Sequence, residues 1–154
     1  EEADEIIHAS PVLPGVIDLI KQAKEKGLQV AIVSSSPHSW VDTHANRLGI
    51  FHYFDHIICA DDVGPGRTKP NPDIFLKALE QLNVRNDAAI VFEDSLNGVL
   101  AARRAGIFVV AVPNPLTAKM GVSGDMTVSS LAELSLQELS AKILNTKDTT
   151  YTKV

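Results

Sequence analysis

Two adjacent carboxylates follow a short apolar run near the middle of the chain. Glu93 and Asp94 come directly after residues 88–92, in the stretch AAIVFEDSLNG. Two like charges this close repel each other unless a cation or a shared proton offsets the repulsion. Mg²⁺ prefers such oxygen ligands and commonly takes one or two carboxylates together with water and a substrate phosphate. The pair therefore indicates a magnesium site.

Hydroxyl groups and a lysine could hold the phosphate that such a metal ion would share. Ser34, Ser35 and Ser36 follow an apolar run, and free N–H groups at a strand-to-helix turn favour an anion. Lys69, in GRTKPNPDIF, supplies a compact positive charge that can hold the same phosphate or neutralise an acidic neighbour. Each feature also has an ordinary structural explanation: serine runs form turns, loop lysines are solvated, and two acids can cap the helix that follows. Their order along the chain favours a joint phosphate and magnesium site.

The segments that must position these residues alternate between strand-like and helix-like patterns. Apolar, partly β-branched runs predict strands over residues 28–33, 56–60, 88–92, 107–112 and 126–128. Apolar faces with helical spacing predict helices over residues 16–23, 40–48, 71–82, 96–103 and 131–144. This alternation predicts a mostly parallel sheet with helices on both faces, and Asn71 is the expected N-cap of its helix. Ligands of such folds bind at the carboxyl ends of the strands, where Ser34 and Glu93 fall.

Composition limits the functions open to the chain. Its 154 residues fit one globular domain, with 45% hydrophobic residues and a mean hydropathy of +0.07. A net charge of −5 without a basic stripe argues against a nucleic-acid surface, and no apolar stretch is long enough to span a membrane. Cys59 is the single cysteine, so no internal disulfide can form and a cytoplasmic location is expected.

Three rival functions need their residues in another arrangement. A serine hydrolase would need a Gly-x-Ser-x-Gly turn around Ser34 and a histidine after the acids, and neither occurs. The stretch from Gly64 to Lys69 lacks the Gly-x4-Gly-Lys-Ser/Thr spacing of a nucleotide-binding loop. A two-component receiver places its acids before its lysine, which is the reverse of the order here. All three are therefore disfavoured.

The order of these motifs resembles the haloacid dehalogenase-like hydrolases. Ser34, Lys69 in KPNPDIF, and the acids in FEDSLNGVLAARRAGI are similar to the second, third and fourth motifs of that family. The likeness is strongest to the β-phosphoglucomutase and phosphatase-like branch, and LPGV at residues 13–16 matches the branch's return into its core domain. The resemblance covers roughly residues 11–113. It implies a Rossmann-like α/β core that transfers a phosphoryl group with Mg²⁺.

The resemblance also implies a role for each motif residue. Ser34 would bind the transferring phosphoryl group, and Lys69 would steady it beside the nucleophile. Glu93 and Asp94 would hold the Mg²⁺ ion. Ser35 and Ser36 would add N–H or hydroxyl contacts to the phosphate, and Asn97 would line the rim of the site.

One family motif is missing from these residues. The first motif, Asp-x-Asp-Gly, carries the aspartate nucleophile on the central strand of the family's sheet, and no Asp-x-Asp occurs here. The resemblance implies that residues 1–10 end a helical cap and its linker, that residues 11–144 form a partial core domain, and that 145–154 form a polar tail. Buried backbone groups without partners cost about 1–3 kcal/mol each, against a total stability of about 5–15 kcal/mol. We therefore expect an amino-terminal segment or another chain to supply the central strand, and these residues alone to be inactive.

Two functions follow from these observations. For the intact parent protein, the resemblance implies hydrolysis of a small phosphomonoester, or a phosphosugar mutase reaction, through an aspartyl-phosphate. The alternative is a non-catalytic relative or fragment that binds a phosphate ligand or a partner chain. The substrate and the oligomeric state stay open. His38 and Trp40 are expected near the site entrance, where they could contact the substrate, and a helix-packing role is the favoured interpretation for Trp40.

Overall fold

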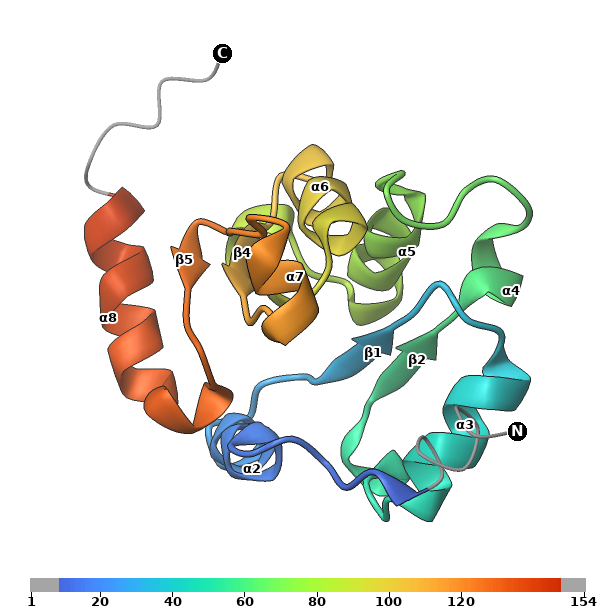
Figure 1. The fold of residues 1–154 in the computed structure, drawn as a ribbon, viewed down its shortest axis with the longest axis horizontal. Coiled ribbons are helices and arrows are strands. Elements are labelled where there is room, and N and C mark those ends of the chain that lie inside the picture. The colour runs from blue at the N-terminus through green and yellow to red at the C-terminus, as the bar shows by residue number, and fades with distance from the viewer. Residues whose placement is uncertain (1–8, 148–154) are drawn as a thin grey trace.

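The computed structural model describes residues 9–147, with side chains described for residues 9–141 (Figure 1). The strands are β1 Ala31–Val33, β2 His56–Ile58, β3 Ile90–Glu93, β4 Phe108–Ala111 and β5 Met126–Thr127. The α-helices are α2 Val16–Glu25, α3 His38–Arg47, α4 Ala60–Val63, α5 Asp73–Leu82, α6 Leu96–Arg104, α7 Pro115–Lys119 and α8 Leu136–Lys147. Three short 3₁₀ helices are η1 Phe51–Tyr53, η2 Asn86–Ala88 and η3 Leu131–Glu133. Strands and helices alternate, as the sequence pattern predicts.

Several boundaries differ from the predicted ones. Cys59 and Ala60, expected at the end of a strand, instead begin the short helix α4. The predicted N-cap Asn71 does not cap α5, whose N-cap is Pro72 and has no side-chain cap bond. The helix predicted over residues 131–144 is two elements, η3 and α8, and α8 continues beyond Leu144 to Lys147. Residues 1–8 and 148–154, which fall in the predicted cap end and polar tail, lie outside the described residues.

Every described strand pair is parallel, but the strands form two sheets. β1 pairs with β2, and β3 pairs with β4, which pairs with β5. The register places Ile32 opposite Ile57 in the first sheet and Val91 opposite Val109 in the second. No hydrogen-bonded ladder joins β1 to β3 within the described chain.

Backbone hydrogen bonds fix which edge of each strand lacks a partner. On β1, Ser34 donates to the Ile58 carbonyl at 2.9 Å, and the carbonyl of Val30 accepts from Asp55 at 2.8 Å. Backbone groups of successive strand residues point to alternate sides, so the even-numbered residues of this segment face β2 and Val33 faces away. On β3 the Glu93 carbonyl accepts from Val112 at 2.7 Å, which turns Glu93 toward β4 and Phe92 away from it. β1 and β3 therefore each present an edge that no described strand pairs.

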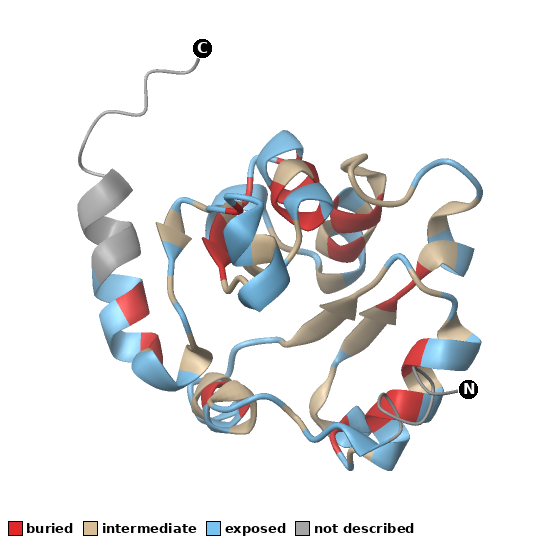
Figure 2. Ribbon diagram, in the orientation of Figure 1, coloured by how far each residue is buried: buried red, intermediate tan, exposed pale blue. Residues whose placement is uncertain are grey.

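The two edge strands are less buried than the strand beside them. All residues of β1 and β3 are half-buried, whereas Val109, Val110 and Ala111 of β4 are fully buried (Figure 2). Inner strands of a parallel sheet are ordinarily covered on both faces and both edges. β1 and β3 are thus covered less completely than β4.

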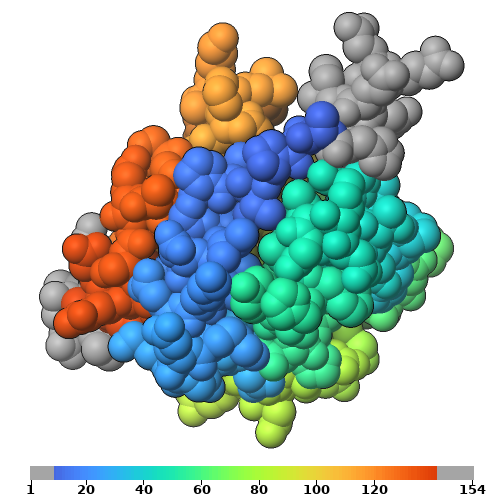
Figure 3. All heavy atoms as spheres, turned by 90° about the horizontal axis from the view of Figure 1, so that it is seen from below, coloured from blue at the N-terminus to red at the C-terminus, as the bar shows by residue number. Residues whose placement is uncertain are grey.

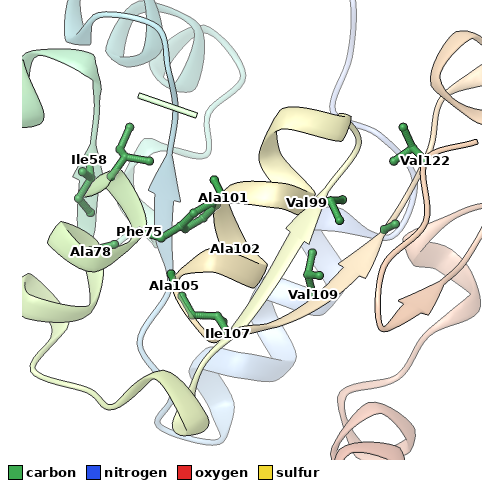
Figure 4. Close-up of a cluster of buried hydrophobic side chains, with 12 residues drawn as sticks. Ile58, Phe75, Ala78, Val99, Ala101, Ala102, Ala105, Ile107, Val109 and Val122 are labelled. Atoms are coloured by element: carbon green, nitrogen blue, oxygen red, sulfur yellow. The ribbon is translucent and has the colours of Figure 1, made fainter. Parts of the chain in front are cut away.

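Helices cover both faces of the sheets, as predicted. On one face α5 and α6 pack against the strands through a cluster of small and branched side chains (Figure 4): Ile58, Ile74, Phe75, Ala78, Val99, Ala101, Ala102, Ala105, Ile107, Val109, Ala111 and Val122. On the other face Leu19 of α2 and Leu136 and Leu139 of α8 pack on Val110 of β4. No helix within the described residues is both long and apolar enough to cross a bilayer.

An ion pair ties α2 to the start of both strands of the first sheet. Lys24 Nζ lies 2.9 Å from each carboxylate oxygen of Asp55, and Oδ2 also accepts the backbone N–H of Val30 at 2.8 Å. The hydrogen bonds from Lys24 and Val30 lower the pKa of Asp55 below 3.8, its ordinary value. A lowered carboxyl pKa stabilises the fold above the ordinary value, and this contribution is lost as the pH falls through the lowered pKa.

We expect Asp55→Asn to lower the free energy of unfolding by about 1 kcal/mol at pH 7, because the change removes the charge but keeps the shape. The loss should shrink at about pH 3, where the wild-type carboxyl is itself becoming protonated. Urea unfolding of both proteins at the two pH values measures this. An equal loss at both pH values would show that the charge of Asp55 contributes nothing.

Candidate active site

Lys69 joins the carboxyl ends of the two sheets. Its Nζ donates to the carbonyl oxygen of Val33, the last residue of β1, at 2.9 Å and pairs with Oε1 of Glu93, the last residue of β3. The Lys69 and Glu93 side chains are only 13% and 8% exposed, and Nζ lies 5.1 Å from the centre of the Phe75 ring. Water screens a charge in such surroundings poorly, so the ammonium group can attract a further anion strongly.

The loop that carries Lys69 is held by side chains on both sides of it. Asn71, the predicted N-cap, instead donates from Nδ2 to the carbonyl of Gly66 at 2.8 Å. Arg104, the last residue of α6, donates from Nη1 to the carbonyl of Pro70 at 2.9 Å. The start of α6 therefore follows the acidic pair, and Arg104 at the end of α6 holds the loop that carries Lys69.

Glu93 and Asp94 lie in different surroundings although they are neighbours. Glu93 is buried against Lys69, whereas Asp94 is exposed. Neither acid caps α6: Ser95 does so, accepting the N–H of Gly98 at 3.1 Å, and its hydroxyl donates to Glu93 Oε2 at 3.4 Å. Lys69 thus supplies the positive charge that offsets the repulsion at Glu93, and Asp94 keeps its carboxylate open to solvent.

The serine loop, residues 34–37, begins one residue beyond the carbonyl that Lys69 contacts. Ser34 is half-buried, and its Oγ accepts the backbone N–H of Ser36 at 3.1 Å. Ser36 is half-buried and Ser35 is exposed. The structure therefore brings Ser34, Lys69 and Glu93 to one end of the molecule, as the order of the motifs predicts.

A pocket of about 480 Å³ opens over Lys69, Glu93 and Asp94. Its walls are the segment before α2, the turn after β4 and the segment leading into η3, through Leu13, Pro14, Phe92, Val112, Pro113, Asn114, Pro115, Ser129, Ser130 and Leu131. Figure 3 shows the segment before α2 (blue) lying on the surface beside α7 (orange). The serine loop and Asn97, which is exposed, are not among the described residues that line this pocket.

A family model described as haloacid dehalogenase-like hydrolase matches residues 1–106. The chain belongs to the haloacid dehalogenase-like hydrolases. Its Rossmann-like α/β fold, with parallel strands and helices on both faces, is the fold of that family's core. The resemblance of the Ser34, Lys69 and Glu93-Asp94 motifs therefore identified the family correctly.

Relatives and solved structures place this chain in the β-phosphoglucomutase-like branch of the family. YhcW of Bacillus subtilis (strain 168) is 40% identical over 124 residues, which are 80% of this chain and 56% of YhcW. Validoxylamine A 7'-phosphate phosphatase of Streptomyces hygroscopicus subsp. limoneus is 34% identical over 126 residues, 82% of this chain and 58% of that enzyme. β-Phosphoglucomutase of Clostridium difficile superposes with a TM-score of 0.77 at 28% identity, covering 92% of this chain and 61% of that one. The chain thus spans less than two thirds of each.

The possible metal ligands of this chain fit a magnesium ion better than a metal that needs many side-chain ligands. Within the described side chains, no group of three or more His, Cys, Asp and Glu residues is arranged to hold a metal ion. Mg²⁺ needs only one or two carboxylates, since water and substrate phosphate complete its shell. Asp94 faces the pocket, and Glu93 lies beside it. The two acids can therefore provide the protein ligands of such an ion.

Two walls of the pocket were not among the predicted site residues. The turn Pro113-Asn114-Pro115 follows the most apolar strand, so the rule that ligands bind at carboxyl ends of strands could have identified it. Ser129 and Ser130 directly follow the strand predicted over residues 126–128, so the same rule could have identified them as well. Trp40 stacks on His44 of its own helix with ring centres 4.2 Å apart, as expected, yet stays 46% exposed.

Proposed function

We propose that this chain forms the Mg²⁺-dependent catalytic core of a phosphatase that hydrolyses small phosphomonoesters through an aspartyl-phosphate. The observation that carries this proposal is the position of Lys69, which contacts the end of β1 beside Ser34 and pairs with Glu93 at the end of β3. A buried ammonium group that contacts the backbone carbonyl next to Ser34 and the Glu93 carboxylate, in a pocket that Asp94 also lines, is suited to a phosphoryl group that shares a metal ion. Validoxylamine A 7'-phosphate phosphatase and the phosphorylated carbohydrates phosphatase of Thermotoga maritima support a small phosphorylated substrate by their names.

Each site residue has a role in this proposal. Ser34 donates its hydroxyl hydrogen to a phosphoryl oxygen, and Lys69 neutralises charge that builds up on the transferring group. Glu93 and Asp94 hold Mg²⁺, which when bound supplies further electrostatic stabilisation of that charge. Ser35 and Ser36 offer additional N–H and hydroxyl donors to the phosphate. Asn97 is exposed in the first turn of α6 and would lie at the rim.

The nucleophile must come from an element that pairs with the two open strand edges. We propose that one further strand lies between β1 and β3, accepts and donates hydrogen bonds along both edges, and ends in an aspartate near Lys69. An amino-terminal segment or another chain would supply it. The aspartate oxygen would attack phosphorus while the ester P–O bond breaks and the alcohol leaves with a proton; water would then hydrolyse the acyl phosphate. Residues 1–10, 11–144 and 145–154 would be the cap end, the core and a tail.

The direct test is turnover of a panel of phosphomonoesters, sugar phosphates included, by the protein expressed from its complete coding sequence. We expect phosphate release with Mg²⁺ and none after chelation. Release that persists without any divalent ion would remove the metal from the proposal. Transfer of the phosphoryl group within one sugar, in place of release, would assign the mutase reaction.

The alternative is a phosphate- or partner-binding protein without turnover. It is favoured by one observation, the lack of Asp-x-Asp in these residues. The complete coding sequence separates the two functions, because an upstream Asp-x-Asp-Gly assigns the enzyme and its absence assigns the binder. A reducing cytoplasm stays the proposed compartment, in keeping with the buried, unbridged thiol of Cys59.

A further inference from the structure

The serine loop is held from the side by the segment that links β2 to α4. Ser34 donates its backbone N–H to the Ile58 carbonyl at 2.9 Å, and Ala60 donates to the carbonyl of Ser36 at 3.1 Å. In Figure 1 the loop after β1 and the start of α4 lie at the same end of the first sheet. The first bond belongs to the pairing of β1 with β2, and the second ties the Ser36 end of the loop to the first residue of α4, so a firm junction between α3 and α4 would hold that end of the loop.

His38, the first residue of α3, makes that junction. Its backbone N–H donates to Asp61 Oδ2 at 2.7 Å, its Nε2 lies 2.8 Å from Asp62 Oδ2, and its Nδ1 lies 3.5 Å from Asp42 Oδ1. Asp62 Oδ2 also accepts the backbone N–H of Cys59 at 2.7 Å. We call His38, Asp42, Asp61 and Asp62 the His38 clamp. It joins the residue directly after the serine loop to the first turn of α4.

Both ring nitrogens of His38 can donate only when the imidazole is protonated, since each neutral tautomer has one donor and one acceptor. Burial lowers the pKa of His38, but hydrogen bonds and charges of Asp62 and Asp42 outweigh it and raise the pKa above 6.5. Burial raises the pKa of Asp62, but the Cys59 N–H, the His38 ring and more distant charges, including Lys77 of α5, bring it below 3.8. Burial and the nearby aspartates raise the pKa of Cys59 to about 11, so its thiol stays neutral between pH 6 and pH 8.5.

The direction of the pH dependence follows from these pKa shifts. A raised His38 pKa strengthens the clamp below pH 6.5, and this contribution is lost as the pH rises through the raised pKa. A lowered Asp62 pKa strengthens it above pH 3.8, with loss as the pH falls through the lowered pKa. The clamp is thus firmest between these two values and loosens on the alkaline side when His38 loses its proton.

We propose that His38 is a positioning residue: its clamp to α4 holds the serine loop in the conformation that binds an anion, and deprotonation of the ring loosens that loop. The inference rests on the proposed function only for the statement that the serine loop binds phosphate. The coupling of His38 to the order of the loop stands on the contacts alone.

The test compares the complete protein with its His38→Gln variant and with His52→Gln as a matched control. His52 is an exposed histidine, for which the described structure shows a ring contact with Tyr53 but no carboxylate partner. Backbone amide exchange of Ser34 and Ser36, corrected for the intrinsic effect of pH, is measured at pH 6 and pH 8.5 by NMR. Sulfate binding is measured at the same pH values, because sulfate keeps its charge over this range.

In wild type and His52→Gln, we expect protection of the Ser34 and Ser36 amides to fall about two- to fivefold from pH 6 to pH 8.5. In His38→Gln, protection should be low at both pH values and the difference should vanish. Equal pH dependence with and without His38, or no pH dependence in wild type, would overturn the inference. A complete lack of sulfate binding would instead count against the phosphate role of the loop, since amide exchange reports on the clamp separately.

Discussion

Replacing Asp94 by Asn should reduce Mg²⁺-dependent hydrolysis of a phosphomonoester by about a hundredfold or more. Asp94 is the exposed member of the acidic pair and faces the pocket, whereas Glu93 is engaged with Lys69. An amide of the same shape keeps the packing of the turn but loses the negative charge that a hard cation needs. The loss should therefore appear in the Mg²⁺ concentration needed for half-maximal activity as well as in the rate.

The matched control for this variant is Asp87→Asn. Asp87 is an exposed carboxylate in η2, which precedes β3 and so lies toward the opposite end of that strand. The same chemical change there should leave both the rate and the Mg²⁺ requirement within about twofold of wild type. Turnover by the Asp94→Asn protein equal to that of the control would remove Asp94 as a metal ligand.

Replacing Gly98 by Ala should lower both stability and activity, although alanine is the better helix former. The gain in helix propensity is about 1 kcal/mol. Against it, a Cβ on Gly98 would overlap the carboxylate of Glu93, which lies against the first turn of α6. The carboxylate would have to move away from Lys69, and separating a largely buried pair costs about 3–5 kcal/mol when one partner is removed outright. We expect a net destabilisation of about 1–3 kcal/mol, with loss of most of the activity.

A double-mutant cycle with Glu93→Ala shows whether that overlap is the cause. When Glu93 lacks its carboxylate, Gly98→Ala should be neutral or stabilising by up to about 1 kcal/mol, as at an ordinary helix position. Urea unfolding of the four proteins gives the interaction energy directly. If Gly98→Ala costs the same in both backgrounds, the small residue at this position serves another purpose than making room for Glu93.

The order and type of the main elements could be predicted from the sequence because the apolar periodicity is strong. Helix α4 could not, since four residues are too few to show a helical period, and its first residue, Ala60, continues the apolar run of the preceding strand. Helix α7 could have been found. Asn114 and Pro115 are an N-cap and first-turn pair, and Asn114 does accept the N–H groups of Leu116 and Thr117 at 2.9 Å.

Part of the site could likewise be predicted from the sequence, and part could not. The meeting of Ser34, Lys69 and Glu93 at one end of the sheets follows from the alternation of strands and helices, which brings carboxyl ends to one edge. The direct pairing of Lys69 with Glu93 does not follow from it, because it depends on the path of the loop that Asn71 and Arg104 hold. The sequence indicated a metal ion beside the two acids and left Lys69 open as the partner of an acidic neighbour, and the structure shows that Lys69 pairs with Glu93.

The central claim is that one group of residues at the ends of β1 and β3 binds a phosphoryl group and a metal ion together. The measurement that tests it most directly is calorimetric titration of inorganic phosphate into the complete protein, with and without Mg²⁺. Two ligands in contact at one site must strengthen each other's binding equally, so Mg²⁺ should tighten phosphate binding by about tenfold or more. Phosphate binding with the same affinity in both titrations would contradict the claim.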